Sequence, residues 1–112
     1  MKPIRAAVLV ASSLLLSACS DSKPMSAADR GRQVYLTNCI ICHNPDPALA
    51  GSQGPPIAGA PRDLVEARIV HAAYPPGYTP QRQTHAMPAQ PFLASKVDDL
   101  TAFLAEANKA GG

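Results

Sequence analysis

The sequence is poor in large aromatic side chains. Its 112 residues include two Phe, three Tyr and no Trp. A chain of this length forms one small domain, and a core built from so few aromatic rings would be thin. We therefore expect a single domain in which something other than the protein's own side chains fills part of the interior.

The sequence also lacks any run of like charges. Two of its ten basic residues, Lys2 and Arg5, lie in a segment that we expect to be removed, so eight basic residues remain against eight acidic ones. There is no basic stripe with interleaved aromatic residues, which is the electrostatic footprint that nucleic-acid binding needs. We therefore predict no nucleic-acid partner.

No apolar run reaches the roughly 20 residues that a membrane-spanning helix needs. The N-terminus instead has a basic start, an apolar stretch over residues 6–16 and small residues leading into Cys19. This layout predicts a secretory signal peptide over residues 1–18. The residues before Cys19 resemble the lipobox of bacterial lipoproteins, in which the cysteine is acylated. An ordinary cleaved signal that leaves Cys19 free or removes it is the alternative, and both versions predict export.

With acyl chains on Cys19, residues 19–25 would form the lipidated cysteine and a polar tether, followed by the folded domain at 26–112. Each buried CH₂ of an acyl chain contributes about 0.8 kcal/mol, and more than one chain makes attachment stable. We therefore expect a lipid anchor that holds the protein on the periplasmic side of a bacterial membrane.

Three cysteines are an odd number for an exported chain, since disulfides pair thiols two at a time. If Cys19 carries lipid, Cys39 and Cys42 remain, within a C-x-x-C-H pattern at residues 39–43 that is typical of covalent haem attachment. Residues three and four apart share one face of a helical turn. Both thiols can then bond the vinyl groups of one porphyrin while His43 reaches the iron, which predicts one covalent haem c.

Two other chemistries are possible for the same residues. A C-x-x-C pair can be a dithiol redox site, but such sites accompany a βαβ pattern, and no β-branched strand followed by a helix precedes Cys39. A structural zinc site needs further ligands at compact spacing, whereas His71 and His85 are distant and unpaired. Haem attachment is the interpretation that the pattern favours.

The second axial ligand of a haem iron held by His43 decides between electron transfer and small-molecule chemistry. Met87 is the candidate, and Pro88 favours an extended conformation for it. Met25 lies too near the attachment helix to reach the opposite face. The alternatives are Met87 as a gap-filling core residue and His85 as the ligand. A methionine ligand raises the reduction potential and closes the iron to substrates.

The chain alternates predicted helices with segments broken by proline and glycine. A first helix over residues 26–39 begins with Ser26 and Asp29 in capping-box spacing. Residues 44–60 form an irregular loop, and Pro61 opens a second helix that ends before Pro75. Its expected apolar face consists of Leu64, Val65, Ile69 and Ala72.

Residues 74–91 are again irregular, and Ser95 with Asp98 predicts the capped start of a last helix that ends at Gly111-Gly112. The expected buried stripe of this helix consists of Val97, Leu100, Phe103, Leu104 and Ala107. The predicted fold class is all-α, with three main helices and long Pro/Gly loops.

Several motifs follow one another in a set order: Gly31 and Tyr35, the C-x-x-C-H segment, Gly54-Pro55-Pro56-Ile57, Met87-Pro88, and Leu100 with Phe103. Over roughly residues 26–108 this set resembles the class I, mitochondrial cytochrome c-like cytochromes. The resemblance implies a cytochrome c-like fold wrapped around one haem. It also implies that the first helix crosses the last at Gly31 and Tyr35, and that the Pro55 carbonyl accepts a hydrogen bond from the His43 ring.

The chain departs from many relatives at two points. It lacks the Trp that they place near a haem propionate, which leaves Tyr74, Tyr78, Arg62 and Arg82 as candidates for that contact. It also lacks the ring of lysines that some relatives use for docking.

Together these features predict an electron-transfer protein and not an enzyme. It would exchange single electrons with a redox protein donor and acceptor through the exposed haem edge near Cys39 and Cys42, with modest salt dependence. The alternatives are a haem-based sensor of small ligands with Met87 absent from the iron, an accessory subunit of a periplasmic oxidoreductase, and a non-haem dithiol or zinc lipoprotein.

Overall fold

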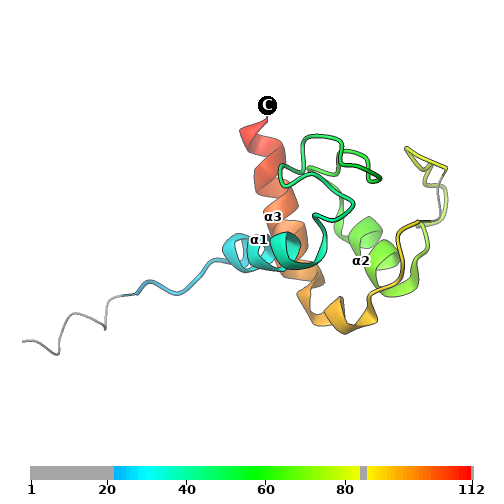
Figure 1. The fold of residues 1–112 in the computed structure, drawn as a ribbon. Helices are drawn as coiled ribbons and strands as arrows, with labels where there is room; N and C mark the ends of the chain where they lie inside the picture. The colour runs from blue at the N-terminus through cyan, green and yellow to red at the C-terminus, as the bar shows by residue number, and fades with distance from the viewer. Residues whose placement is uncertain (1–21, 84–85, 112) are drawn as a thin grey trace, which may run out of the picture.

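The computed structural model describes residues 22–83 and 86–111. The predicted signal peptide, Cys19 and His85 lie outside the described residues. Three α-helices and one 3₁₀ helix, with long irregular connections, make up the described part, which contains no strand (Figure 1). The all-α class is thereby confirmed. The elements are α1 (Ala27–Asn38), α2 (Arg62–His71), the 3₁₀ helix η1 (Pro91–Lys96) and α3 (Val97–Ala110).

The start of α1 has the predicted capping box. The Asp29 backbone N–H donates to Ser26 Oγ at 3.0 Å, and the Ser26 N–H donates to Asp29 Oδ2 at 3.3 Å. Two backbone donors that a helix start leaves without partners are thus satisfied. The helix ends at Asn38, and Cys39 caps it with an N–H bond to the Tyr35 carbonyl.

The second helix, α2, differs in detail from the prediction. The sequence predicts Pro61 as the first residue of the helix, but Pro61 occupies the N-cap position and the helix begins one residue later, at Arg62. The Pro61 carbonyl accepts the Val65 N–H at 3.1 Å. Val65 and Ile69 are buried as predicted. Ala72, expected on the same apolar face, is exposed, because it takes a left-handed conformation with φ of 50° that ends the helix.

The predicted capping box at the start of α3 is wrong. Ser95 lies inside η1, and no side chain caps α3. The 3₁₀ helix runs directly into α3, so the Val97 N–H already donates to the Ala94 carbonyl and needs no side-chain acceptor. At the other end, Gly111 is the C-cap.

Helices α1 and α3 cross at close range (Figure 1). Gly31 is buried at the crossing, where a Cβ atom would overlap the backbone carbonyl of Asp99. The ring of Tyr35 lies 5.2 Å from that of Phe103, centroid to centroid. The crossing that the family resemblance implied is therefore present. The core continues from it through Val65, Ile69, Leu93, Val97, Leu100 and Leu104.

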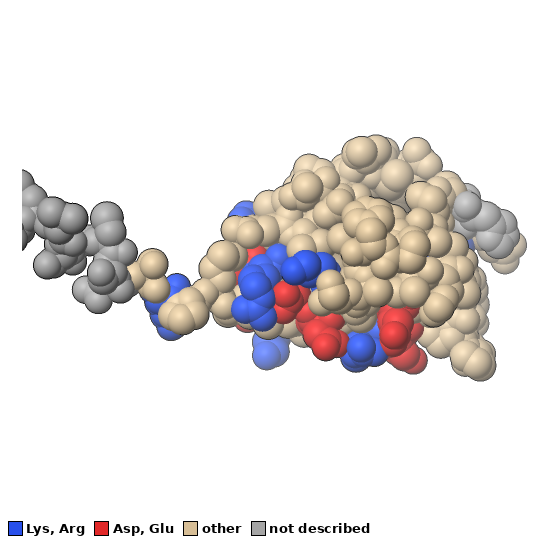
Figure 2. Space-filling view, turned by 90° about the horizontal axis from the view of Figure 1, so that it is seen from below, with Lys and Arg blue, Asp and Glu red and all other residues tan. Residues whose placement is uncertain are grey.

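Charged side chains of both signs gather on one face of the molecule (Figure 2). Arg30 binds the Asp99 carboxylate with two hydrogen bonds, of 2.8 and 3.0 Å, and this contact lowers the pKa of Asp99. Arg62 binds Asp98 at 2.7 Å and also pairs with Glu66. The Arg62 pairs are exposed and contribute little stability, so the fold depends chiefly on the apolar core. In the part of the chain that is described, no helix is long and apolar enough to span a membrane.

Candidate haem site

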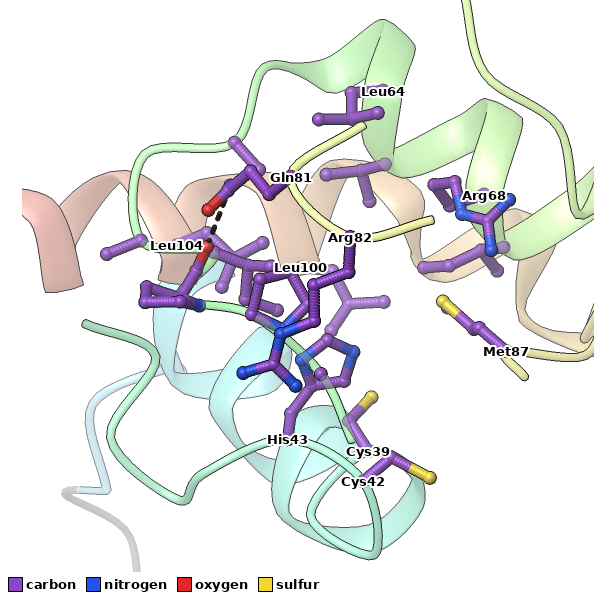
Figure 3. A pocket seen from close by; sticks show the side chains of 18 of the residues that line it. Cys39, Cys42, His43, Leu64, Arg68, Gln81, Arg82, Met87, Leu100 and Leu104 are labelled. Carbon is purple, nitrogen blue, oxygen red and sulfur yellow. Dashed lines mark hydrogen bonds between the residues drawn. The ribbon is translucent and has the colours of Figure 1, made fainter. Parts of the chain in front are cut away.

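The C-x-x-C-H segment continues α1 by one further helical turn. The His43 N–H donates to the Cys39 carbonyl at 2.9 Å, and the Cys42 N–H donates to the same oxygen at 3.3 Å. The two thiols and the imidazole therefore stand along one side of a single turn. In Figure 3 the His43 ring points into a pocket, and both cysteines lie at the pocket's edge. Neither cysteine forms a disulfide within the described residues.

The pocket is a partly open cavity of about 340 Å³ between α1, α2, α3 and the two long loops. Met87 reaches it from the loop between α2 and η1, and its sulfur points inward (Figure 3). The structure thus brings together the five residues that the sequence analysis predicts for haem attachment, iron ligation and the contact with the His43 ring: Cys39, Cys42, His43, Pro55 and Met87. Leu64, Ile69, Leu100 and Leu104 are among the apolar residues that line the rest of the cavity.

The imidazole of His43 is held against the loop that follows it. A Cβ on Gly54 would overlap Nδ1, Cε1 and Cγ of the ring, so only glycine fits there. This contact places Nδ1 against the loop and leaves the Nε2 side of the ring turned away from Gly54. Nδ1 is buried and has no well-formed hydrogen bond.

Burial is the main reason that the pKa of His43 is lowered. The nearby Pro55 carbonyl partly opposes this effect by raising the pKa, while the Arg82 charge lowers it further. A lowered pKa keeps the ring neutral, which is the form that binds a metal. The hydrogen bond from His43 to Pro55 stays a prediction, since Nδ1 is the donor that would make it.

The surroundings of Cys39 do not suit the rival chemistries. Burial raises the pKa of its thiol to about 11, whereas reactive dithiol sites lower the pKa to form thiolate. Among residues 22–83 and 86–111, no group of three or more His, Cys, Asp or Glu side chains is placed to hold a metal ion. Neither observation supports a dithiol site or a zinc site at Cys39 in this part of the chain.

The loop after His43 is fixed to the attachment turn by backbone bonds. The Cys42 carbonyl accepts the N–H groups of Gln53 and Gly54, at 3.1 and 2.8 Å. On the core side, the Tyr35 hydroxyl donates to the Asn44 carbonyl at 2.6 Å. Burial raises the pKa of Tyr35 to about 12, so the phenol stays protonated and keeps donating. The loop and the turn therefore form one rigid wall of the cavity.

Tyr74 and Tyr78 also line the cavity, and their rings stack 5.4 Å apart. The guanidinium of Arg68 lies 4.3 Å from the centre of the Tyr74 ring. Arg82 donates to the Gln53 carbonyl at 2.7 Å. Arg68 and Arg82 are thus the two cationic side chains among the residues that line the cavity.

Arg62, which the sequence suggested for a contact with a haem propionate, does not line the cavity because Asp98 and Glu66 bind it. Sequence reasoning missed Arg68 and Gln81, both of which line the cavity. Arg68 follows Leu64 by four residues, and this spacing was the signal that could have placed it on the inner face of α2.

The domain is all-α, its C-x-x-C-H turn borders an apolar cavity, and a methionine enters that cavity from a separate loop. This is the arrangement of a c-type cytochrome. The family model described as Cytochrome c matches residues 28–108. The chain belongs to the cytochrome c family. A search of curated proteins and a search of solved structures gave no match.

Family membership implies a covalently bound haem c and a role as a haem-based electron carrier. The residues present fit that group. Two thiols lie at the edge of the cavity, a half-buried imidazole points into it with its Nε2 side turned away from Gly54, and the remaining wall is largely apolar.

Proposed function

We propose that this protein is an extracytoplasmic one-electron carrier with a single haem c, whose iron His43 and Met87 would ligate. The observation that carries the proposal is that these two residues, from segments more than forty positions apart, line the same cavity as Cys39 and Cys42. The haem, when bound, supplies the Fe(II)/Fe(III) couple. Electron transfer of this kind makes and breaks no substrate bond, so we propose that the protein is not an enzyme.

Each chain residue has a separate task in this proposal. The thiols of Cys39 and Cys42 would form the thioether bonds that hold the haem. Gly54 lets the loop approach His43, and the Pro55 carbonyl orients the ring by accepting from Nδ1. Met87 would hold the iron together with His43, which would exclude water and substrates from the metal. The apolar wall lowers the local dielectric and so contributes to the reduction potential.

Replacing Met87 with alanine tests the axial ligand. We expect covalent haem to survive denaturation in both wild type and Met87→Ala, and the far-red methionine-to-ferric charge-transfer band to disappear in the variant. The reduction potential should also fall, because a methionine ligand raises it. Visible absorption of the oxidised and reduced protein, made in a host that attaches haem, measures these effects.

Met25→Ala is the matched control for this experiment. Met25 is 43% exposed and does not line the cavity, so its replacement should leave the band in place. If covalent haem is present but the band never appears, or the reduced wild type binds carbon monoxide without denaturation, the small-ligand sensor replaces our proposal. Absence of covalent haem would refute the proposal altogether.

We also propose that the protein acts on the periplasmic side of a bacterial membrane, where a lipid on Cys19 anchors it. The support is the signal-like segment at residues 1–18 and the lipobox-like approach to Cys19. Cys19→Ser is expected to move most of the haem-containing protein from the membrane fraction to the soluble fraction, because the acyl chains provide the attachment. Fractionation with haem staining measures this shift, and equal membrane retention of the variant would contradict the anchor.

A further inference from the structure

The segment that carries Met87 has little regular structure of its own. Residues 74–89, which we call the Met87 segment, contain four prolines and, in the described part, no helix or strand. The backbone hydrogen bonding within its described residues is a single turn, in which the Tyr78 N–H donates to the Pro75 carbonyl at 3.1 Å. The place of such a segment in the fold depends on its contacts with other parts of the chain.

Two side chains bond the middle of the Met87 segment to the loop that follows α1. Gln81 Nε2 donates to the Pro56 carbonyl at 3.1 Å, and Arg82 Nη1 donates to the Gln53 carbonyl at 2.7 Å. From the described residues of the segment, no other hydrogen bond reaches another part of the described chain. The ends of the segment lead to α2 and η1, so these two side chains are what secures its middle.

The two acceptors lie on either side of the contact with His43. Between Gln53 and Pro56 in the sequence are Gly54 and Pro55, the two residues that lie against the His43 ring. Backbone hydrogen bonds from this stretch to the attachment turn fix it in place. Neighbouring residues of one segment therefore bind two carbonyls, three positions apart, on a rigid part of the other loop.

We propose that Gln81 and Arg82, which we call the loop clasp, are positioning residues that hold the Met87 segment against the wall that fixes His43 (Figure 3). This inference rests on the proposed ligation of the iron by His43 and Met87. The clasp keeps the Met87 sulfur in the cavity that His43 enters, and so lowers the fraction of molecules in which Met87 is detached. A competing ligand binds only that fraction, so its apparent affinity falls with it.

Imidazole binding to the ferric, haem-loaded protein tests the loop clasp, with the loss of the far-red band as the measure of Met87 displacement. We expect Gln81→Leu to raise the affinity for imidazole about threefold or more. Arg82→Leu should raise it about tenfold or more, because a hydrogen bond from a charged donor contributes more than one from a neutral donor.

The two variants differ in charge. The Arg82 charge lowers the pKa of His43, so removing it changes more than one hydrogen bond. Gln81→Leu removes a hydrogen bond and no charge, which makes it the decisive variant. At about pH 8 imidazole is mostly neutral, so the loss of the Arg82 charge does not itself attract or repel the probe.

Gln83→Leu is the matched control. Gln83 is an exposed glutamine of the same segment that does not line the cavity and, within the described residues, makes no hydrogen bond to another segment. We expect its affinity for imidazole to stay within about twofold of wild type. A second control repeats Gln81→Leu in a Met87→Ala background, where it should change nothing, because no methionine remains to be detached.

The inference is overturned if Gln81→Leu and Arg82→Leu bind imidazole as wild type does, or if Gln83→Leu gains as much. A gain that persists in the Met87→Ala background also overturns it, since the clasp would then cover the cavity and not hold the methionine. So does an equal loss of global stability in guanidinium unfolding. Failure of the proposed function is distinct, because it appears in the wild type before imidazole is added, as the absence of covalent haem or of the far-red band.

Discussion

Replacing Gly31 with alanine is expected to lower the free energy of unfolding by about 2 kcal/mol or more. The added Cβ would overlap the Asp99 carbonyl where α1 crosses α3, and backbone atoms of a packed helix cannot move aside cheaply. In an ordinary helix interior the same change would stabilise the protein by about 1 kcal/mol. A loss of stability would therefore show that Gly31 lies at a close contact between helices. Guanidinium unfolding of the haem-loaded protein, followed by helical circular dichroism, measures it.

Gly111→Ala is the control for this change. Gly111 caps α3 with φ of −90°, and the nearest atoms to an added Cβ lie 3.6 Å away. We expect its unfolding free energy to stay within about 0.5 kcal/mol of wild type. If Gly31→Ala were as stable as wild type, the close crossing of α1 and α3 would not exist in solution.

Replacing Gly54 with alanine is expected to disturb the haem iron itself. The new methyl group would occupy the space of the His43 ring, so the imidazole must turn or shift away from Pro55. We expect the six-coordinate, low-spin absorption spectrum to be lost in a large fraction of molecules and the reduced variant to bind carbon monoxide. The covalent haem should remain, because the contact involves His43 and not the cysteines.

Gly77→Ala is the control that distinguishes the loss of this contact from a general effect of backbone strain. Gly77 has φ of 79°, where a side chain costs about 1–2 kcal/mol, but nothing lies within 4 Å of an added Cβ. Its variant should be less stable yet keep the wild-type haem spectrum. A Gly54→Ala protein with an unchanged six-coordinate spectrum would show that the loop does not hold the His43 ring as described.

Local features of the sequence predicted the helices well where their signals lie within a few residues. The Ser26–Asp29 capping box and the apolar spacing of Val65 and Ile69 act over one or two turns. The same reasoning failed at Ser95, because a capping-box pattern does not show whether another helix precedes the predicted start. Here the 3₁₀ helix runs into α3 and supplies backbone acceptors, so no side-chain cap is needed.

The sequence by itself determined the chemistry of the attachment turn, because the spacing of Cys39, Cys42 and His43 is set by one helical turn. It also determined the family, through motifs that keep their order along residues 28–108. Only the tertiary structure decided that Met87 enters the cavity of His43, that Gly54 touches the imidazole, and that Arg68 and not Arg62 lines the site. These contacts join segments across long loops of proline and glycine, whose paths follow no periodicity and depend on packing against the rest of the fold.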